Sequence, residues 1–424
     1  MYELMKKLYP ICRSITGDGV RDTLNIIKEI IPIKIHEVPS GTKAFDWVVP
    51  KEWNIKDAYI KNSKGEKIVD FRVSNLHVLN YSIPINTTVT LDELRKHTYT
   101  LLDHPDWIPY VTSYYAENWG FCMSHKQYEK LEDDIYEVVI DSTLEDGSLT
   151  YGELFIKGES NEEVLFSTYL CHPSLCNDNL SGVVLTTFLA KLVMGMKPFY
   201  SYRFLFIPET IGSIIWLSRN EDKISKIKHG LVVTCVGHSK GMTYKRSRRG
   251  NAEIDKVVEK VLLDSGHSFE IIGFLLPESD ERQYCSLGFD LPVGSLMRTP
   301  YGHFPEYHTS ADDLDLVKPI HLEESLDRYM DVIFILENNG IYLSTNPKCE
   351  PQLGRRGLYR TISKPSSEIS AQAIFWFLNL ADGTNSLLDI SLQSGIDFKQ
   401  IKETSGLLID KGLLIKSRGE RIGN

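Results

Sequence analysis

Short apolar runs alternate with amphipathic stretches from about residue 135 onward. Six runs rich in β-branched and aromatic residues have the composition of buried strands; they lie at 136–143, 149–158, 163–170, 202–209, 230–237 and 291–297. Apolar residues recur with helical spacing in the intervening and following stretches, at 179–195, 212–225, 252–266 and 322–339. This alternation predicts an α/β layer structure around a mainly buried sheet.

The regions on either side of this pattern differ from it. Residues 1–31 carry a helical stripe, whereas the stretch from about 37 to 130 has alternating polarity, many turn residues and an aromatic-rich segment at 107–119. We therefore expect a core domain formed by 1–36 and 131–345, with a small β-rich domain, 37–130, inserted into it. The Trp107–Trp119 segment is interpreted as core or domain contact in preference to a substrate wall.

The C-terminal part has its own pattern. A Gly-, Pro- and Arg-rich stretch at 340–357 predicts a linker, and three helices are expected at 367–383, 385–396 and 397–412, followed by a hairpin at 413–422. Three helices and a hairpin in so few residues indicate a winged helix, assigned to residues 346–424. Its ten Lys and Arg residues against seven Asp and Glu residues after position 354 are too nearly balanced for strong DNA binding. A homo-oligomer contact or a protein partner is the alternative role.

Composition narrows the class of protein. The 424 residues carry a net charge of −10, which argues against nucleic acid as the main partner. The apolar runs are shorter than the roughly 20 residues that a membrane-spanning helix requires, and the N-terminus lacks a signal-peptide pattern. Seven cysteines without framework spacing favour a reducing compartment, so a cytoplasmic location without membrane association is expected.

Candidate chemistry lies where predicted strands end. His172 and Asp178 follow the run at 163–170, Glu209 follows the next run, and His308 lies in a later loop. Ligands of α/β sheets bind at the carboxyl ends of the strands, and imidazole and carboxylate groups are zinc ligands. With one glutamate left as a base, these residues predict a site for metal-assisted hydrolysis.

Simpler interpretations exist for each residue. Asp178 alone fits a helix cap, Glu209 fits a helix N-terminus, and the two histidines fit ordinary loop positions. A structural zinc site on Cys171 and Cys176 is disfavoured, because no second closely spaced cysteine pair accompanies them. Because all four residues are expected at the same sheet edge, we favour one metal site over four unrelated local roles.

Three segments carry a family resemblance: HPSLCNDNLSG at 172–182, PET at 208–210 and YHTSADD at 307–313. They resemble the zinc exopeptidases of the bacterial leucyl-aminopeptidase and glutamate-carboxypeptidase type. The whole chain is similar to bacterial aminopeptidase-like proteins that share the RSITGDGVRDTL segment at 13–24, an inserted β domain and a C-terminal winged helix. The resemblance implies a three-layer core with a mostly parallel mixed sheet, and zinc held by His172, Asp178 and His308.

The chain also departs from the exopeptidase pattern. The family usually has two adjacent glutamates, but Thr210 follows Glu209, and the aspartate ligand expected after the next strand is missing, with His238 the nearest substitute. We therefore expect one zinc ion rather than two.

The resemblance implies an aminopeptidase that acts on a small peptide or another amide. Glu209 is expected as the general base that takes a proton from zinc-bound water; if it is instead a ligand, the base would come from nearby acidic loops. Those loops are also expected to bind the substrate, through Asp280, Glu281, Glu306 and Tyr307. A non-peptide amide such as an acylamino sugar, and a winged-helix regulator with a ligand-sensing α/β domain, are the alternatives.

Overall fold

The computed structural model describes residues 1–274, 279–358 and 371–417. Its contacts divide the chain into two compact units, one of Met1–Gly250 and Glu270–Leu326, the other of Asn251–Phe269 and Asp327–Asn424. Within the described ranges, every helix is too short or too polar to cross a bilayer.

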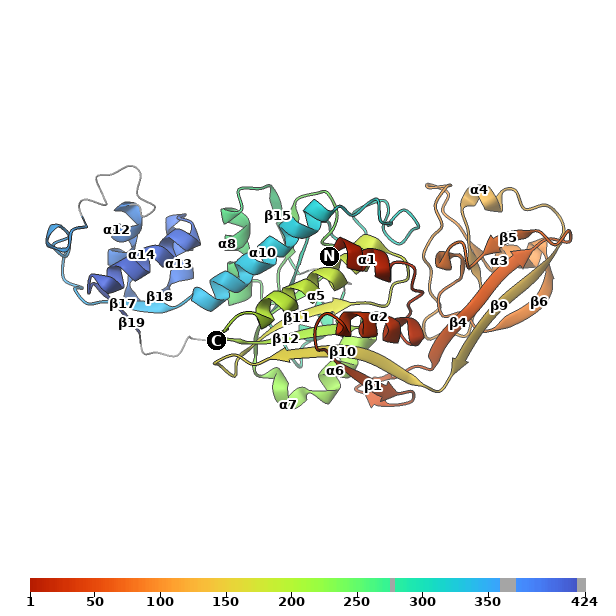
Figure 1. The fold of residues 1–424 in the computed structure, drawn as a ribbon, viewed down its shortest axis with the longest axis horizontal. Helices are drawn as coiled ribbons and strands as arrows, with labels where there is room; N and C mark the ends of the chain where they lie inside the picture. The colour runs from red at the N-terminus through yellow and green to blue at the C-terminus, as the bar shows by residue number, and fades with distance from the viewer. Residues whose placement is uncertain (275–278, 359–370, 418–424) are drawn as a thin grey trace. The chain divides into compact units, whose positions relative to one another are not determined.

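An eight-stranded mixed sheet organises the first unit (Figure 1). Its four central strands, in the order β12-β11-β13-β16, are parallel, and β1, β10 and β14 pair antiparallel on the flanks. This confirms the predicted sheet, in which five of the six apolar runs form strands. The run at 136–143, expected in the core domain, instead forms β9 (Ile135–Glu145) of a separate sheet, because it pairs with strands of the inserted region. In spatial order the strands are β1 (Lys34–Pro39), β10 (Ser148–Ile156), β12 (Ser201–Ile207), β11 (Glu163–Tyr169), β13 (Ile227–Val233), β16 (Val293–Met297), β14 (Met242–Lys245) and β15 (Phe269–Ile272).

Helices cover both faces of this sheet. On one side lie α1 (Tyr2–Leu8), α2 (Asp18–Lys28) and α5 (Ser181–Met194), and on the other α6 (Ile211–Arg219) and α7 (Glu221–Ile224) (Figure 1). Ten of the fourteen residues of α5 are buried, which is why that helix shows almost no polar face in the sequence. The three-layer core is confirmed.

A separate four-stranded antiparallel sheet has the order β5-β4-β9-β6. Alternate residues of β4 and β9 pack inward with a common apolar core that includes Ala58, Ile60, Val138 and Ile140. Strand β9 is followed directly by β10 of the large sheet, so the chain passes from one sheet into the other at this point (Figure 1). The strands are β4 (Glu52–Lys61), β5 (Lys67–Asp70), β6 (Ile85–Thr90) and β9 (Ile135–Glu145), accompanied by α3 (Leu91–Lys96), α4 (His125–Tyr128) and the short pairs β2 (Lys43–Ala44) with β3 (Trp47–Val48) and β7 (Thr98–Tyr99) with β8 (Phe121–Cys122).

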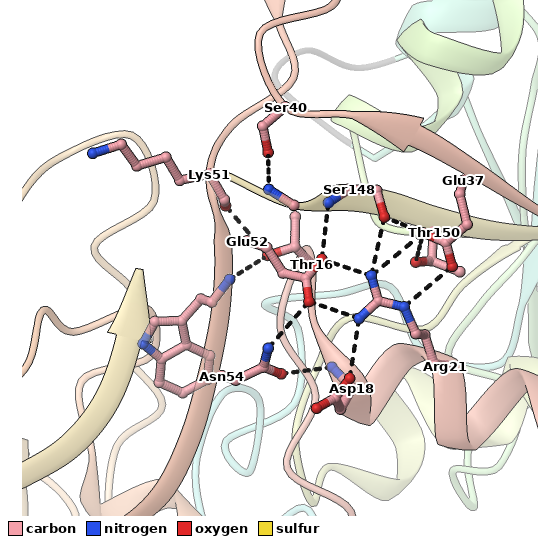
Figure 2. A network of polar contacts seen from close by, with 12 residues as sticks. Thr16, Asp18, Arg21, Glu37, Ser40, Lys51, Glu52, Asn54, Ser148 and Thr150 are labelled. Carbon is pink, nitrogen blue, oxygen red and sulfur yellow. Dashed lines mark hydrogen bonds and ion pairs between the residues drawn. The ribbon is translucent and has the colours of Figure 1, made fainter. Parts of the chain in front are cut away.

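Arg21 of α2 ties the start of β4 to the large sheet (Figure 2). Its two terminal nitrogens donate to the carboxylate of Glu52 at 2.7 and 2.6 Å, and its Nε donates to Glu37 of β1 at 3.1 Å. The backbone N–H of Ser148 donates to Glu52 as well, at 2.8 Å. Hydrogen bonds to charged groups of this kind are stronger than neutral ones, so the network fixes the place where the inserted segment leaves the core.

The second unit contains the winged helix. Three helices, α12 (Ala371–Leu380), α13 (Leu387–Ser394) and α14 (Phe398–Asp410), occur where the sequence predicts them. A three-stranded sheet of order β18-β17-β19 completes it, formed by β18 (Asp382–Ser386), β17 (Ile341–Ser344) and β19 (Leu414–Lys416). The unit also includes α8 (Glu253–Asp264) and the second half of α10 (Pro319–Asn338).

The prediction of a linker at 340–357 is wrong for residues 341–344. Residues Ile341–Ser344 form the central strand of the small sheet, because Leu343 and Tyr342 pair with β19 and the apolar side chains of β17 alternate between buried and exposed. Of the predicted C-terminal hairpin, residues 414–416 form β19, which pairs with β17; residues 418–422 lie outside the described ranges.

Candidate metal centre

Three loops that follow the parallel strands bring the four predicted residues together. His172 comes after β11, Glu209 after β12 and His308 after β16, and Asp178 lies in a π-helical turn, Cys176–Leu180, that leads into α5. The helix therefore begins at Ser181. The Asn179 side chain accepts the Gly182 N–H at 3.2 Å, and its amide donates to the Thr168 hydroxyl and to the Tyr169 carbonyl. The turn directs Asp178 toward the sheet edge.

The distances define one compact cluster. His308 Nε2 lies 3.0 Å from Asp178 Oδ2, and one ligand atom from each of His172, Asp178 and His308 lies within 4.8 Å of the others. His172 Nε2 also lies 3.7 Å from Glu209 Oε2. The sequence analysis thus predicted that these four residues lie at one edge of the large sheet. Their roles as ligands and as general base remain predictions.

Asp178 is held in position by residues that the sequence analysis did not single out. The Tyr169 hydroxyl donates to Asp178 Oδ1 and lies 2.7 Å from the Thr234 hydroxyl. The Asp312 carboxylate accepts the backbone N–H groups of Asn177 at 2.5 Å and Asp178 at 2.9 Å. The DD pair at 312–313 was visible in the sequence, but nothing local to it indicated that the first acid binds the Asp178 turn.

The cluster fits a zinc ion by three criteria. Burial lowers the pKa of His172 to about 4, so the ring is the neutral imidazole that coordinates metals. Burial alone would raise the pKa of Asp178, but the adjacent His172 and His308 lower it, so this residue is a carboxylate. Within the described residues, Asp178 Oδ2, His308 Nε2 and His172 Nδ1 are buried polar atoms with no conventional hydrogen bond, as expected where an ion would satisfy them.

Glu209 has a different environment from the three residues of the cluster. Its Oε1 accepts a hydrogen bond from the Ser279 hydroxyl at 2.8 Å, and burial, together with the charges of Asp280 and Asp178, raises its pKa well above the ordinary value. A neighbouring cation would lower that pKa again. Thr210 has a left-handed backbone (φ 62°), and its N–H donates to Asp280 at 2.7 Å, so the turn that carries Glu209 is fixed by a second acid.

The inserted region contributes a tyrosine to the cluster. Tyr110 contacts His172 and His308 edge-on, with ring centroids 5.2 and 5.1 Å apart, and its N–H donates to the His308 carbonyl at 2.7 Å. The segment at 107–119 was interpreted as core or domain contact, and both kinds of contact occur in it. Trp119 stacks on His97 near the core of the small sheet, and Tyr110 contacts the core domain beside the candidate ligands. Its spacing gave no signal for this placement.

The four predicted substrate contacts are found in two kinds of environment. Asp280 is fully buried next to Glu209, with a pKa raised to about 7 by burial, and Tyr307 stacks on His308 at 3.9 Å. Glu306 is half-buried, on the loop before His308. Glu281 is fully buried, and its oxygens are bound by Lys245, Tyr301 and Ser295, so a substrate contact would require this ion pair to break.

His238 does not join the cluster. Its Nδ1 lies 2.7 Å from the Thr299 hydroxyl and its ring stacks on Phe304. At the end of β13 it is Cys235 that approaches Asp178, at 4.0 Å. Among the described residues the close groups of ligand atoms comprise Cys171, His172 and Glu209, and His172, Asp178 and His308.

Comparison with known proteins gives two family matches. Residues 2–339 match the family described as a domain of unknown function (DUF4910), and residues 340–416 match a winged helix-turn-helix family. The second match confirms the winged helix.

A curated protein and a crystal structure, both from Clostridium acetobutylicum, are similar to almost the whole chain. One, described as a candidate polysaccharide biosynthesis protein with an aminopeptidase-like domain, is 58% identical over 415 residues, which cover 98% of this chain and 95% of the relative. The crystal structure of a candidate peptidase at 2.37 Å resolution is 56% identical, covers 98% of this chain and 96% of that chain, and has a TM-score of 0.93.

A more distant structure, BSAP, a zinc aminopeptidase from Bacillus subtilis, has a TM-score of 0.58 at 11% identity and covers 79% of this chain and 94% of that chain. The likeness shows that the core has the zinc-aminopeptidase fold, as the sequence resemblance implies.

Proposed function

Because this chain belongs to the DUF4910 family and has the fold of the zinc aminopeptidases, we propose that it is a zinc-dependent hydrolase that cleaves an amide bond. The coarser assignment, a peptidase-type hydrolase, is supported by the description of the relatives and by the fold. The finer one, one zinc ion with Glu209 as general base, is supported by the site.

The observation that carries the proposal is the cluster of His172, Asp178 and His308, whose ligand atoms lie within 4.8 Å of one another. Zinc bonds of about 2.1 Å in a tetrahedral site place ligand atoms roughly 3.4 Å apart. The distance of 3.0 Å between His308 and Asp178 needs only a small adjustment. Three protein ligands leave the fourth position for water or substrate, as in catalytic zinc sites.

Glu209 is the proposed general base. When bound, a zinc ion would lower the pKa of its water toward about 7 and polarise the amide carbonyl. The Glu209 carboxylate, 3.7 Å from His172, would take the proton of the attacking water and pass it to the leaving nitrogen. The Ser279 hydroxyl binds the other oxygen of Glu209, which holds the carboxylate in one orientation. The amide C–N bond breaks, and the water oxygen remains on the acyl carbon.

A non-peptide amide is the second candidate for the substrate. The Clostridium acetobutylicum relative is described in terms of polysaccharide biosynthesis, and an amide on an amino sugar would present the same carbonyl and nitrogen as a peptide. The reaction and the catalytic groups would be unchanged; only the group attached to the nitrogen differs.

Metal removal and reconstitution test the proposed function. The purified full chain should release amine from at least one member of a panel of aminoacyl amides, dipeptides and N-acyl amino sugars. Treatment with a chelator should abolish that activity, and added zinc should restore it. Activity that survives complete metal removal would contradict the proposal.

A further inference from the structure

A second group of possible ligand atoms lies directly beside the candidate metal centre. The atoms belong to Cys171, His172 and Glu209, and they lie within 4.8 Å of one another. His172 Nε2 is 3.7 Å from Glu209 Oε2, close to the roughly 3.4 Å that separates two ligands of one tetrahedral zinc ion. We call Cys171, His172 and Glu209 the thiol site.

The sheet holds the Cys171 sulfur beside Glu209. Strands β11 and β12 are parallel neighbours, and the loops that follow them leave the same edge of the sheet. Cys171 follows β11, Glu209 follows β12, and the Glu209 backbone N–H donates to Cys171 Sγ at 3.3 Å. The position of the sulfur is therefore fixed by the same geometry that places His172 and Glu209.

Cys171 differs from a buried cysteine that serves only packing. Cys285 lies in the same apolar core, is equally buried at 1% exposure, and its thiol contacts the carbonyls of Leu291 and Val293 at 3.2 Å. Within the described ranges, Cys171 accepts a hydrogen bond but donates none. Its S–H proton can therefore be replaced by a metal ion without the loss of a hydrogen bond.

The charges of the thiol site suit a divalent ion. Buried charges are stable only when they are balanced, and a thiolate and a carboxylate together carry the two negative charges that such an ion neutralises. Burial raises the pKa of the Cys171 thiol, so the sulfur keeps its proton until an ion binds and releases it. Thiolate sulfur selects soft metal ions, unlike the imidazole and carboxylate groups of the neighbouring cluster.

His172 belongs to both groups of ligand atoms. A neutral imidazole has one acceptor nitrogen, so His172 serves one ion at a time. An ion in the thiol site therefore competes for His172 with an ion held by Asp178 and His308, and it also occupies the carboxylate of Glu209.

We propose that the thiol site is an inhibitory position for soft divalent metal ions such as Cd²⁺. The inference rests on the proposed function, because an ion bound there withdraws His172 from the zinc ion and Glu209 from proton transfer. As the S–Cd bond forms, the S–H bond of Cys171 breaks and its proton passes to solvent. The metal keeps its oxidation state, so no oxidant or reductant takes part.

Titration of the zinc-loaded full chain with Cd²⁺ tests the proposal by ultraviolet absorption and by activity. Every protein carries Cys349→Ser, which removes an exposed cysteine. Without further substitution, a thiolate-to-cadmium charge-transfer band should appear as activity falls. Cys171→Ser retains an acceptor for the Glu209 N–H but should lose the band. The Cd²⁺ concentration that halves its activity should rise at least about 10-fold, because the loss of even an outer partner of a ligand costs about 10- to 100-fold in affinity.

Cys285→Ser is the matched control and should keep both the band and the sensitivity to Cd²⁺. Equal inhibition of Cys171→Ser without the band would place Cd²⁺ at the proposed zinc position and overturn the proposal. A band that survives in Cys171→Ser would belong to another thiol and would overturn it as well.

The absorption measurement does not depend on turnover, so it separates the thiol site from the reaction. A band that requires Cys171, in a protein that hydrolyses no amide, would support this metal position while contradicting the proposed function. Amide hydrolysis without any such band would overturn the thiol site and leave the proposed function standing.

Discussion

His308 Nε2 lies 3.0 Å from Asp178 Oδ2, although the two residues belong to loops after different strands of the large sheet. The same His308 accepts the N–H of Tyr110 through its backbone carbonyl. One residue therefore links the loop after β16, the π-helical turn before α5 and the inserted aromatic segment. The candidate centre is complete only when all three segments are in place.

Asp312 should matter for metal binding although it is not a candidate ligand. Its carboxylate accepts the N–H groups of Asn177 and Asp178, and an amide in its place could accept only one of them. Asp312→Asn should lower zinc affinity about 10- to 100-fold, the usual effect of losing support for a ligand, with a fold unchanged by circular dichroism. Competition with a zinc chelator gives the measurement.

The exposed Asp315 in the same loop provides the control, since Asp315→Asn should leave zinc affinity unchanged. Equal zinc affinity in the Asp312→Asn variant and the wild type would show that the Asp178 turn holds its conformation without this carboxylate.

The Arg21–Glu52 contact should make stability depend on pH in the acid range. The hydrogen bonds from Arg21 lower the pKa of Glu52 from 4.5 to about 2. A lowered folded-state pKa contributes stability that is fully present above pH 4.5 and is lost as the pH falls toward 2. Glu52→Gln should therefore be less stable than the wild type at pH 7, by about 1.5–3 kcal/mol for a hydrogen bond to a charged group, and the difference should shrink below pH 4.5.

Urea unfolding at pH 7 and pH 3 measures this difference. Glu3→Gln removes a carboxylate whose ion pair with Lys6 is exposed and should change stability little at either pH. If Glu52→Gln lowers the free energy of unfolding by the same amount at both pH values, the loss does not come from the charge of Glu52.

The winged helix is not expected to bind DNA strongly. The recognition helix of such folds normally enters the major groove with its N-terminal residues, but here the Phe398 N–H donates to Asp264 of α8 and Lys399 pairs with Asp331 of α10. Asp397 caps the same turn. Three carboxylates around the first turn of α14 would repel phosphate groups.

Fluorescence anisotropy with random duplex DNA at about 0.15 M salt tests this expectation. We expect no submicromolar binding by the full chain. Submicromolar affinity that falls steeply with added salt would contradict it and would favour the regulator alternative.

The sequence predicts the core of the fold well because the relevant signals are local. A strand such as β11 is a continuous apolar run, and the side chains at its end, including His172, are carried to the sheet edge by geometry that all parallel strands share. Helices α13 and α14 were also predicted, since each has its own helical stripe and its own N-cap. Ser386 caps α13, and Asp397 caps α14.

The parts that the sequence did not predict depend on partners distant in the chain. Tyr110 reaches the histidines only because Pro109 pairs with Thr309, and β17 is a strand only because β19 and β18 lie on either side of it. Asp312 supports Asp178 through backbone N–H groups, which leave no trace in residue type. The same limit applies to Glu281, whose neutralisation by Lys245 follows from a contact between separate elements.

Zinc content and turnover of Glu209→Gln, measured on the same preparation beside the wild type and His308→Ala, test the central claim most directly. With His172, Asp178 and His308 as ligands and Glu209 as base, Glu209→Gln should keep its zinc and lose about 10²- to 10⁴-fold in kcat, whereas His308→Ala should lose zinc. A Glu209→Gln protein that is free of metal would make Glu209 a ligand, and one that keeps full activity would exclude it as the base; either result would contradict the account.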